Sequence, residues 1–245
     1  MATPVGFPGR LSLHPDFSAS VTVVGRERSP VIVVDNFLGN PELLIDYAAA
    51  QAAFEGVADT SYPGLRAPLP AIYVSTVRAL VARLIADTYG LDDSTISGEF
   101  GYFSLVTTPP GQLSPLQCMP HIDETNPRRL AALHYLCDAA HGGTSFYRQR
   151  RTGFETVDEA RAPVYRKAIV EEIATHGLPR QQYICGDNAL FEQTASFAAA
   201  YNRLLIYRSL TLHSPDIHPG FSFDGDPRSG RLTANGFYFY QSAVA

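Results

Sequence analysis

The sequence predicts a mainly β fold, either a sandwich or a closed jelly roll, with helices in its N-terminal part. From about residue 98, short segments rich in Tyr, Phe, Val and Leu alternate with Gly and Pro turns, which is typical of antiparallel strands. Before that point, apolar residues recur at helical spacing. Because no linker-like stretch separates the two parts, we expect one domain over residues 1–245, with a strand and a helical layer in 1–97 and the β core in 98–245.

The N-terminal part is expected to hold one strand and two helices. Residues 1–29 show no regular pattern, whereas β-branched residues dominate the segment that follows. Asn40 followed by Pro41 is a typical helix start, and Gly90 is a typical helix end. The predicted elements are a strand at 30–35, a helix at 40–50 and a helix at 74–89.

The β core is expected to contain seven strands and one helix. Aromatic and β-branched residues predict the strands, and Val164, Ala168, Ile169 and Ile173 at helical spacing predict the helix. The predicted strands lie at 101–107, 129–137, 144–148, 181–185, 188–192, 203–213 and 231–241, and the helix lies at 157–175.

Composition weighs against several classes of protein. A net charge of −5 disfavours a nucleic-acid binder, which usually carries a basic face. No stretch reaches the roughly 18 apolar residues that span a bilayer, and residues 1–8 lack the basic and apolar segments of a secretory signal. Cys118, Cys137 and Cys185 show no CxxC spacing, so we expect small buried hydrophobic residues in a reducing compartment. These observations predict a cytoplasmic protein without nucleic-acid or membrane partners.

The histidines offer one pattern with chemical meaning, a His-x-Asp pair followed much later by another His. Two strand residues separated by one position face the same side, so an imidazole and a carboxylate can bind one metal ion. A further histidine completes the two-histidine, one-carboxylate set that is typical of non-haem Fe(II). His121-Ile122-Asp123 lies at the rim of the β core, and His213 ends a predicted strand ninety positions after Asp123.

Each part of this pattern has a structural alternative. His14-Pro15-Asp16 has the same spacing, but it lies in the irregular N-terminal segment and is better explained as a surface turn. His213 could instead be a structural histidine that caps a strand and is hydrogen-bonded to a loop. Counting with a period of two puts His213 on the more polar side of the strand at 203–213, and the other side is apolar enough to pack under the N-terminal helices.

The C-terminal strand adds a candidate anion site. Arg231, Thr233, Asn235 and Phe237 share one face of the strand at 231–241. A guanidinium with a hydroxyl two residues away can hold a carboxylate through a bidentate pair and one further hydrogen bond. Eighteen residues after the candidate metal histidine, this pair is placed to anchor the far end of a chelating diacid.

Five segments occur in a recognisable order along the chain. They are His121-Ile122-Asp123, His134-Tyr135-Leu136-Cys137-Asp138, Gly142-Gly143-Thr144-Ser145-Phe146-Tyr147, Leu212-His213-Ser214 and Arg231-Leu232-Thr233. The set resembles the Fe(II)/2-oxoglutarate-dependent oxygenases, in particular the prolyl-4-hydroxylase-like branch and a poorly characterised bacterial group within it. The resemblance covers residues 98–241 and implies a double-stranded β-helix, the jelly roll of cupin-like proteins.

The resemblance implies a catalytic metal centre. His121, Asp123 and His213 match the residues that bind Fe(II) and form the catalytic site, with 2-oxoglutarate and O₂ as cosubstrates. The implied reaction is hydroxylation of a small molecule, an amino acid or a peptide, with release of succinate and CO₂. Asp at position 123 fills the coordination position that a halogenating relative leaves for halide, so hydroxylation is favoured over chlorination, while desaturation and cyclisation stay open.

The resemblance also implies a cosubstrate site. Arg231 matches the residue that binds the distal carboxylate of 2-oxoglutarate, and Thr233 matches its hydroxyl companion. Tyr135 matches a strand tyrosine that often bonds the same carboxylate. The long loop before Arg231 is rich in Pro and Gly, which departs from the family pattern and leaves Arg228 as the alternative anchor.

Other residues are expected to be structural. His134 is out of phase with Tyr135 and should face away from the cavity, His141 adjoins a Gly-Gly turn, and His176 lies at a helix end. The basic run at 148–151 is expected to be a solvated loop.

Two other classes of protein fit part of the pattern. A cupin-like metalloenzyme without 2-oxoglutarate would leave Arg231 without a role, and a non-catalytic jelly-roll binding module would bind no divalent metal tightly. The sequence does not determine the oligomeric state, and a homodimer is one expectation. Loops at 107–120, 148–157 and 214–230 are expected to ring the substrate pocket.

Overall fold

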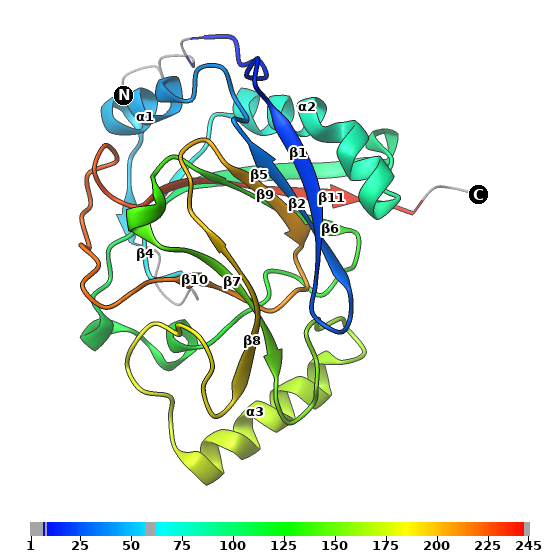
Figure 1. Cartoon of the computed structure of the whole chain (residues 1–245), viewed down its shortest axis with the longest axis vertical. Coiled ribbons are helices and arrows are strands. Elements are labelled where there is room, and N and C mark those ends of the chain that lie inside the picture. The colour runs from blue at the N-terminus through cyan, green and yellow to red at the C-terminus, as the bar shows by residue number, and fades with distance from the viewer. Residues whose placement is uncertain (1–6, 8, 57–61, 243–245) are drawn as a thin grey trace.

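The part of the chain that the structure describes, residues 7, 9–56 and 62–242, forms three α-helices and two antiparallel sheets in the computed structural model (Figure 1). The larger sheet has the strand order β1-β2-β9-β6-β11-β5-β4-β3, and the smaller has the order β10-β7-β8. The strands are β1 (Ser18–Val24), β2 (Ser29–Asp35), β3 (Glu55–Gly56), β4 (Gly64–Pro68), β5 (Ile96–Val106), β6 (Arg129–Tyr135), β7 (Gly143–Gln149), β8 (Phe191–Ala198), β9 (Leu204–Arg208), β10 (His213–Asp216) and β11 (Leu232–Tyr240). The helices are α1 (Glu42–Gln51), α2 (Ala71–Tyr89) and α3 (Ala162–His176).

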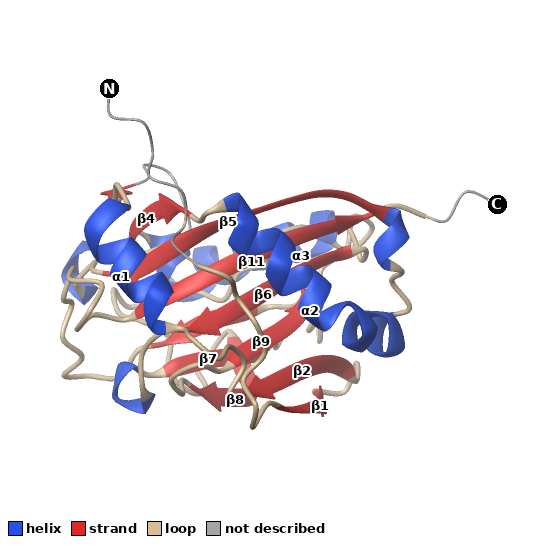
Figure 2. Cartoon of the chain, turned by 90° about the horizontal axis from the view of Figure 1, so that it is seen from above, coloured by secondary structure: helices blue, strands red, loops and turns tan. Residues whose placement is uncertain are grey.

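Strand register divides the larger sheet into two faces with different neighbours. Alternate residues of a strand point to opposite sides, so residues paired across strands share a face. One such row runs Phe103, Ala234, His134 and Leu204 across β5, β11, β6 and β9. The apolar members of this row pack with residues of α1 and α2, and Figure 2 shows both helices lying over this face.

The opposite face of the larger sheet packs against the smaller sheet. Tyr135, Leu205 and Tyr207 belong to this face and form a buried cluster with Phe146 of β7. The rings of Phe146 and Tyr207 are 5.1 Å apart and nearly perpendicular, a favourable aromatic geometry. Side chains from the two sheets therefore meet in the space between them.

The helix predicted at 74–89 is confirmed as α2. Its end is set by Gly90, which adopts the left-handed conformation with φ 65° and donates its N–H to the Ala86 carbonyl at 3.0 Å. Glycine closes helices in this way because it has no Cβ to clash at positive φ. The strand predicted at 30–35 is likewise confirmed as β2.

Several predictions for the N-terminal part are wrong. Residues 18–24, expected to be irregular, form β1, whose side chains are mostly exposed but whose backbone pairs with β2 along its full length. Strands β3 and β4 carry no pattern that predicted them. Asn40 does not cap α1, because its side-chain amide donates to the Arg10 carbonyl at 3.1 Å and the helix begins after Pro41.

Two predicted core strands differ from those observed. The segment 181–185 is a loop, and the strand expected at 188–192 lies further along the chain, as β8. Tyr183 is buried there although its backbone does not pair with a strand, and its hydroxyl donates to the Thr108 carbonyl at 2.7 Å. A short apolar run predicts burial but not the backbone pairing that makes a strand. Helix α3 also begins later than the predicted residue 157.

The strand predicted at 203–213 is two strands in different sheets. β9 ends before a turn at residues 209–210, and His213 begins β10 in the smaller sheet. The expected packing of its apolar side under the N-terminal helices holds for β9. It fails for Leu212, which packs with residues of α3, because a period of two does not continue through a turn.

The basic run at 148–151 is not a solvated loop throughout. Arg148 lies in β7, is only 6% exposed, and forms ion pairs with Glu155 and Glu192. Arg150 and Arg151 are exposed, as expected.

Two expectations concern targeting. Among the described residues, no helix combines the length and the apolar character needed to cross a bilayer. The segment 1–8, where the sequence shows no secretory signal, lies outside the described residues except for Phe7.

Asn202 is a buried link between distant segments, and its loss should destabilise the fold. Its side chain accepts hydrogen bonds from the Leu38 N–H (2.9 Å) and His134 Nε2–H (3.0 Å) and donates to the Leu38 carbonyl (2.8 Å). Its φ is 64°, a conformation that alanine adopts poorly. We expect Asn202→Ala to lower the free energy of unfolding, measured by urea denaturation, by about 2–4 kcal/mol.

Asn36 provides a matched control for this prediction. It also has a positive φ, 50°, but it is exposed and its side chain makes one hydrogen bond, to the Asp16 carbonyl. Asn36→Ala should therefore cost only about 1 kcal/mol, the conformational part of the effect. Equal losses in the two variants would contradict a stabilising role for the buried bonds of Asn202.

Candidate metal centre and its pocket

Two backbone hydrogen bonds hold His121 beside His213. The N–H of each residue donates to the carbonyl of the other at 2.9 Å, so the loop before β6 joins the first residue of β10 as an antiparallel bridge. The two imidazole rings have centroids 4.4 Å apart. Asp123 is held next to them because its N–H donates to the Ser209 carbonyl at 2.8 Å, in the turn after β9. Local backbone pairing thus brings together residues that are far apart in the sequence.

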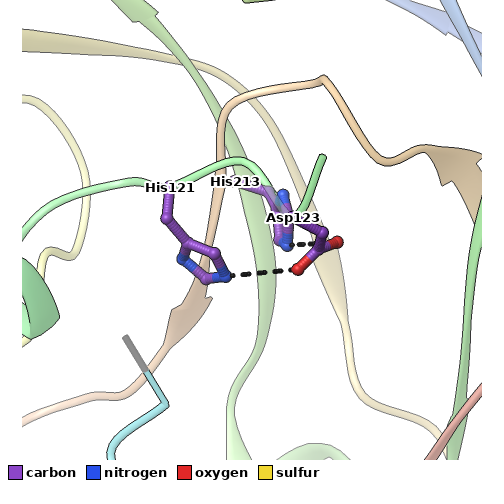
Figure 3. A group of neighbouring side chains, drawn as sticks. All are labelled: His121, Asp123 and His213. Atoms are coloured by element: carbon purple, nitrogen blue, oxygen red, sulfur yellow. Dashed lines mark ion pairs between the residues drawn. The ribbon is translucent and has the colours of Figure 1, made fainter. Parts of the chain in front are cut away.

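The three side chains converge on one point, as Figure 3 shows. His121 Nε2 lies 3.7 Å from Asp123 Oδ1, and His213 Nε2 lies 3.6 Å from Asp123 Oδ2. One ligand atom from each residue lies within 4.8 Å of the others. These separations are longer than hydrogen bonds, which need about 2.7–3.2 Å, and they leave space for a metal ion between the atoms.

Electrostatics and hydrogen bonding prepare these groups to bind a cation. His213 Nδ1–H donates to the Thr211 carbonyl at 2.8 Å, which leaves the Nε2 lone pair free. Burial, with the nearby charges of His213 and Arg66, holds the pKa of His121 well below its usual range, so this imidazole is neutral. Burial raises the pKa of Asp123, against the opposing effects of His213 and Arg66. Two imidazoles and one carboxylate are a donor set that suits a divalent ion such as Fe(II).

Arg231 is a buried cation without a carboxylate partner among the described residues. It is 2% exposed and lines the same pocket as the three candidate ligands. Its Nε and Nη2 donate to the His141 carbonyl at 3.1 Å and the Gly143 carbonyl at 2.7 Å. These bonds fix the guanidinium but leave its charge unbalanced, and an isolated buried charge is costly. The pocket therefore favours an anionic ligand at this end.

Two hydroxyl groups lie near Arg231. Thr233 is opposite Tyr135 in the β11–β6 ladder, and its buried Oγ1 has no hydrogen-bond partner among the described residues. The Tyr135 ring lies 5.7 Å from the Arg231 guanidinium carbon, and its hydroxyl is bonded to Thr144 Oγ1 at 2.6 Å. Burial raises the pKa of Tyr135 to about 12, so the hydroxyl stays protonated. The unpartnered Thr233 oxygen fits the same anionic ligand.

The alternative anchor Arg228 and the histidines expected to be structural, His134 and His141, do not line the pocket. Arg228 is exposed and forms a 2.7 Å ion pair with Asp46. His134 is fully buried on the helix-covered face and is bonded to Tyr73. The His141 ring is bonded to the Asp138 carboxylate and to the Ser229 carbonyl, and the backbone carbonyl of His141 accepts from Arg231.

Sequence reasoning missed the wall of the pocket that β4 and β5 provide. Tyr62 and Arg66 line the hollow at the candidate ligands, and Arg66, Phe100 and Tyr102 line the adjoining one. The alternating aromatic residues Phe100 and Tyr102 in β5 could have predicted that this face lines the pocket. No pattern in the sequence predicted that Arg66 lies there. The expected loops contribute little, since only Pro215 among them lines either hollow.

A second group of possible ligands consists of Cys185, Asp216 and His218, with one ligand atom of each within 4.8 Å of the others. The Asp216 carboxylate already accepts hydrogen bonds from two serine hydroxyls at 3.0 Å, and the other two residues are exposed. This group is therefore less suited to hold a resident metal. The expectation of buried cysteines is confirmed for Cys118 and Cys137 and is wrong for Cys185.

The chain belongs to the family of unknown function DUF6445, which it matches over residues 15–238. No curated protein matches the sequence.

Solved structures with a similar chain course include three proteins of low sequence identity. HygX from Streptomyces hygroscopicus, with nickel and 2-oxoglutarate bound, is 12% identical over 88% of this chain and 85% of its own, with a TM-score of 0.46. SnoK, a non-haem α-ketoglutarate-dependent carbocyclase from nogalamycin biosynthesis, is 13% identical over 89% and 84%, with a TM-score of 0.47. An N-substituted L-amino acid dioxygenase from Burkholderia ambifaria is 11% identical over 86% and 83%, with a TM-score of 0.39. At such identities and TM-scores the likeness does not establish an activity, so function is argued from the site.

If His121, Asp123 and His213 bind one metal ion, the loss of any one of these side chains should lower the affinity for that ion. We expect His121→Ala, Asp123→Ala and His213→Ala to weaken Mn²⁺ binding, measured by calorimetry or by the EPR signal of free Mn²⁺, by about 100-fold or more. His218→Ala, which alters the second group, should leave this affinity unchanged. Tight Mn²⁺ binding that is lost only in the His218 variant would place the metal at Cys185, Asp216 and His218 and contradict this prediction.

Proposed function

We propose that this protein is a non-haem Fe(II)- and 2-oxoglutarate-dependent dioxygenase that hydroxylates a small molecule, an amino acid or a peptide, releasing succinate and CO₂. The observation that carries the proposal is the unbalanced charge of Arg231, which lines the same pocket as two histidines and one carboxylate. A metal-chelating diacid satisfies both features at once. A double-stranded β-helix and membership of the prolyl-4-hydroxylase-like branch belong to the same proposal.

In this proposal His121, Asp123 and His213 hold Fe(II) and form the catalytic centre. When bound, the iron with 2-oxoglutarate and O₂ supplies the oxidant that breaks a substrate C–H bond. The protein orients the reactants: the backbone bridge fixes the two imidazoles, and the Thr211 carbonyl fixes the tautomer of His213.

Arg231 and Thr233 bind the distal carboxylate of the cosubstrate. The Arg231 guanidinium is held by two backbone carbonyls, so it needs little reorganisation to receive the anion. Thr233 offers its unpartnered hydroxyl, and Tyr135 contributes through its neutral hydroxyl near the same charge. Tyr207, which lines the pocket and packs against Phe146, limits water there.

The main rival is a cupin-like metalloenzyme that does not use 2-oxoglutarate. It accounts for the histidines and Asp123 but leaves the charge of Arg231 without a counter-ion. A non-catalytic binding module shares this difficulty and also leaves the convergence of three metal-binding side chains without a purpose. Each of these two alternative functions therefore explains fewer features of the site than the oxygenase does.

Arg231 provides the most direct test. We expect Arg231→Gln to raise the dissociation constant for 2-oxoglutarate of the Mn²⁺-loaded protein about 10- to 100-fold, because a charge-assisted hydrogen bond to a buried anion is lost. Thr233→Val should raise it less, by about tenfold or under. Binding is measured by calorimetry and by the rise in melting temperature, since a ligand of the native state must stabilise it.

Arg228→Gln is the matched control, because Arg228 is an exposed arginine three positions away that is paired with Asp46. It should bind 2-oxoglutarate as the wild type does. Formation of succinate from 2-oxoglutarate should require added Fe(II) and vanish in His121→Ala, Asp123→Ala and His213→Ala. Full succinate formation in the His213 variant would refute the assignment of the ligands.

A further inference from the structure

Arg66 is a second cation at the site that forms no ion pair with a described residue. Among the described residues its side chain makes no ion pair, and its buried Nε has no hydrogen-bond partner. Glu55 is opposite Arg66 in the β3–β4 ladder but forms no ion pair with it. The guanidinium instead lies against the rings of Tyr62 and Tyr102, at 4.5 and 5.6 Å from their centroids. Such stacking orients a guanidinium and leaves its N–H edge free for an anion.

Arg66 faces the space between the sheets. It is opposite Ser104 in the β4–β5 ladder, and Ser104 is opposite Thr233 in the β5–β11 ladder. Arg66 therefore shares a face with the proposed cosubstrate residues but lies two strands from Thr233. It also lines an adjoining hollow of about 300 Å³ that reaches Asp123 and that Arg231 does not line. This adjoining hollow is large enough for a ligand of the size of an aromatic acid.

The floor of the adjoining hollow is an aromatic shelf formed by Phe100, Tyr102, Phe237 and Phe239. The ring of Phe100 lies 5.7 Å from that of Tyr102, 5.2 Å from that of Phe237 and 5.4 Å from that of Phe239. Phe100 is 44% exposed, although phenylalanine is usually buried. The other three rings are half-buried, so the group presents partly exposed apolar surface beside the candidate metal centre, which suits an apolar ligand.

We propose that the adjoining hollow is the subsite for the primary substrate, a carboxylic acid with a ring-containing apolar body. Its carboxylate binds Arg66, and its body lies on the aromatic shelf, beside Asp123 of the candidate metal centre. This inference rests on the proposed function, because a ligand bound in the subsite can react only if the candidate metal centre binds a metal ion.

The charges of the adjoining hollow set the direction of the ligand. Arg66 lies in its lining together with Asp123 and Glu124, so the same hollow contains one cation and two carboxylates. The carboxylates repel a bound anion, and the guanidinium attracts it. The acidic end of the substrate therefore lies at Arg66, and its apolar part extends toward the metal ligand.

The absence of tryptophan from the chain permits a direct binding test, because the fluorescence of an indole ligand is then free of a protein indole background. Indole-3-acetate and its neutral isostere indole-3-acetamide are titrated into protein loaded with Zn²⁺ and 2-oxoglutarate, which does not turn over. 3-Phenylpropionate and its amide are tested by competition. We expect the acids to bind about tenfold tighter than the amides, since only the acids offer a charge to Arg66.

Arg66→Gln should abolish the preference for the acids, and Arg66→Lys should retain part of it. Arg129→Gln is the matched control: the Arg129 guanidinium also stacks on the shelf, 4.4 Å from the Phe239 ring, but lines neither hollow. This variant should keep the preference. Acids and amides that bind equally well, or no binding of either, would overturn the inference.

The 2-oxoglutarate affinity separates this inference from the proposed function. Arg66→Gln should weaken 2-oxoglutarate binding much less than Arg231→Gln does. Equal weakening in both variants would make Arg66 a cosubstrate residue and overturn the inference alone. If the wild-type protein binds neither metal nor 2-oxoglutarate, the proposed function fails, and acid binding measured without them still reports on the role of Arg66.

Discussion

The candidate centre depends on one constraint, the reciprocal backbone hydrogen bonds between His121 and His213. They join a loop that leads into the larger sheet to a strand of the smaller sheet. The turn after β9 has two consequences: it moves the chain into the second sheet, and the Ser209 carbonyl in it holds the N–H of Asp123. These backbone hydrogen bonds therefore bring the three side chains together.

The same strands build the core on one side and the pocket on the other. In β11, Ala234 and Tyr238 are buried under the helices, while Thr233, Asn235 and Phe237 line the pocket. A shift of register by one residue would exchange these sets, so the packing of α1 and α2 also secures the position of the pocket residues. The stability of the helix-covered face and the geometry of the site are thus linked through one sheet.

Two arginines that line the pocket have no described carboxylate in an ion pair with them. Arg148 is as deeply buried as a site residue but is paired with Glu155 and Glu192, which is how proteins usually tolerate a buried cation. Arg231 and Arg66 have no such partners among the described residues. The two guanidinium groups that line the pocket without an ion pair to a described residue, one deep and one nearer the surface, fit the two acids of the proposals above, the cosubstrate and the substrate.

The sequence alone determined the chemical inventory of this protein: His121, Asp123 and His213 as a possible metal set, Arg231 with Thr233 as an anion site, and a β-rich core. These follow from residue type, from the short spacings of His121 to Asp123 and of Arg231 to Thr233, and, for His213, from the order of motifs along the chain. Only the tertiary structure decided which residues meet. The single strand expected at 203–213 is broken by a turn, β1, β3 and β4 form by pairing rather than by pattern, and Arg66 reaches the pocket because β4 pairs with β5. Such pairings depend on hydrogen bonds between segments far apart in the chain, and no local pattern of side chains records them.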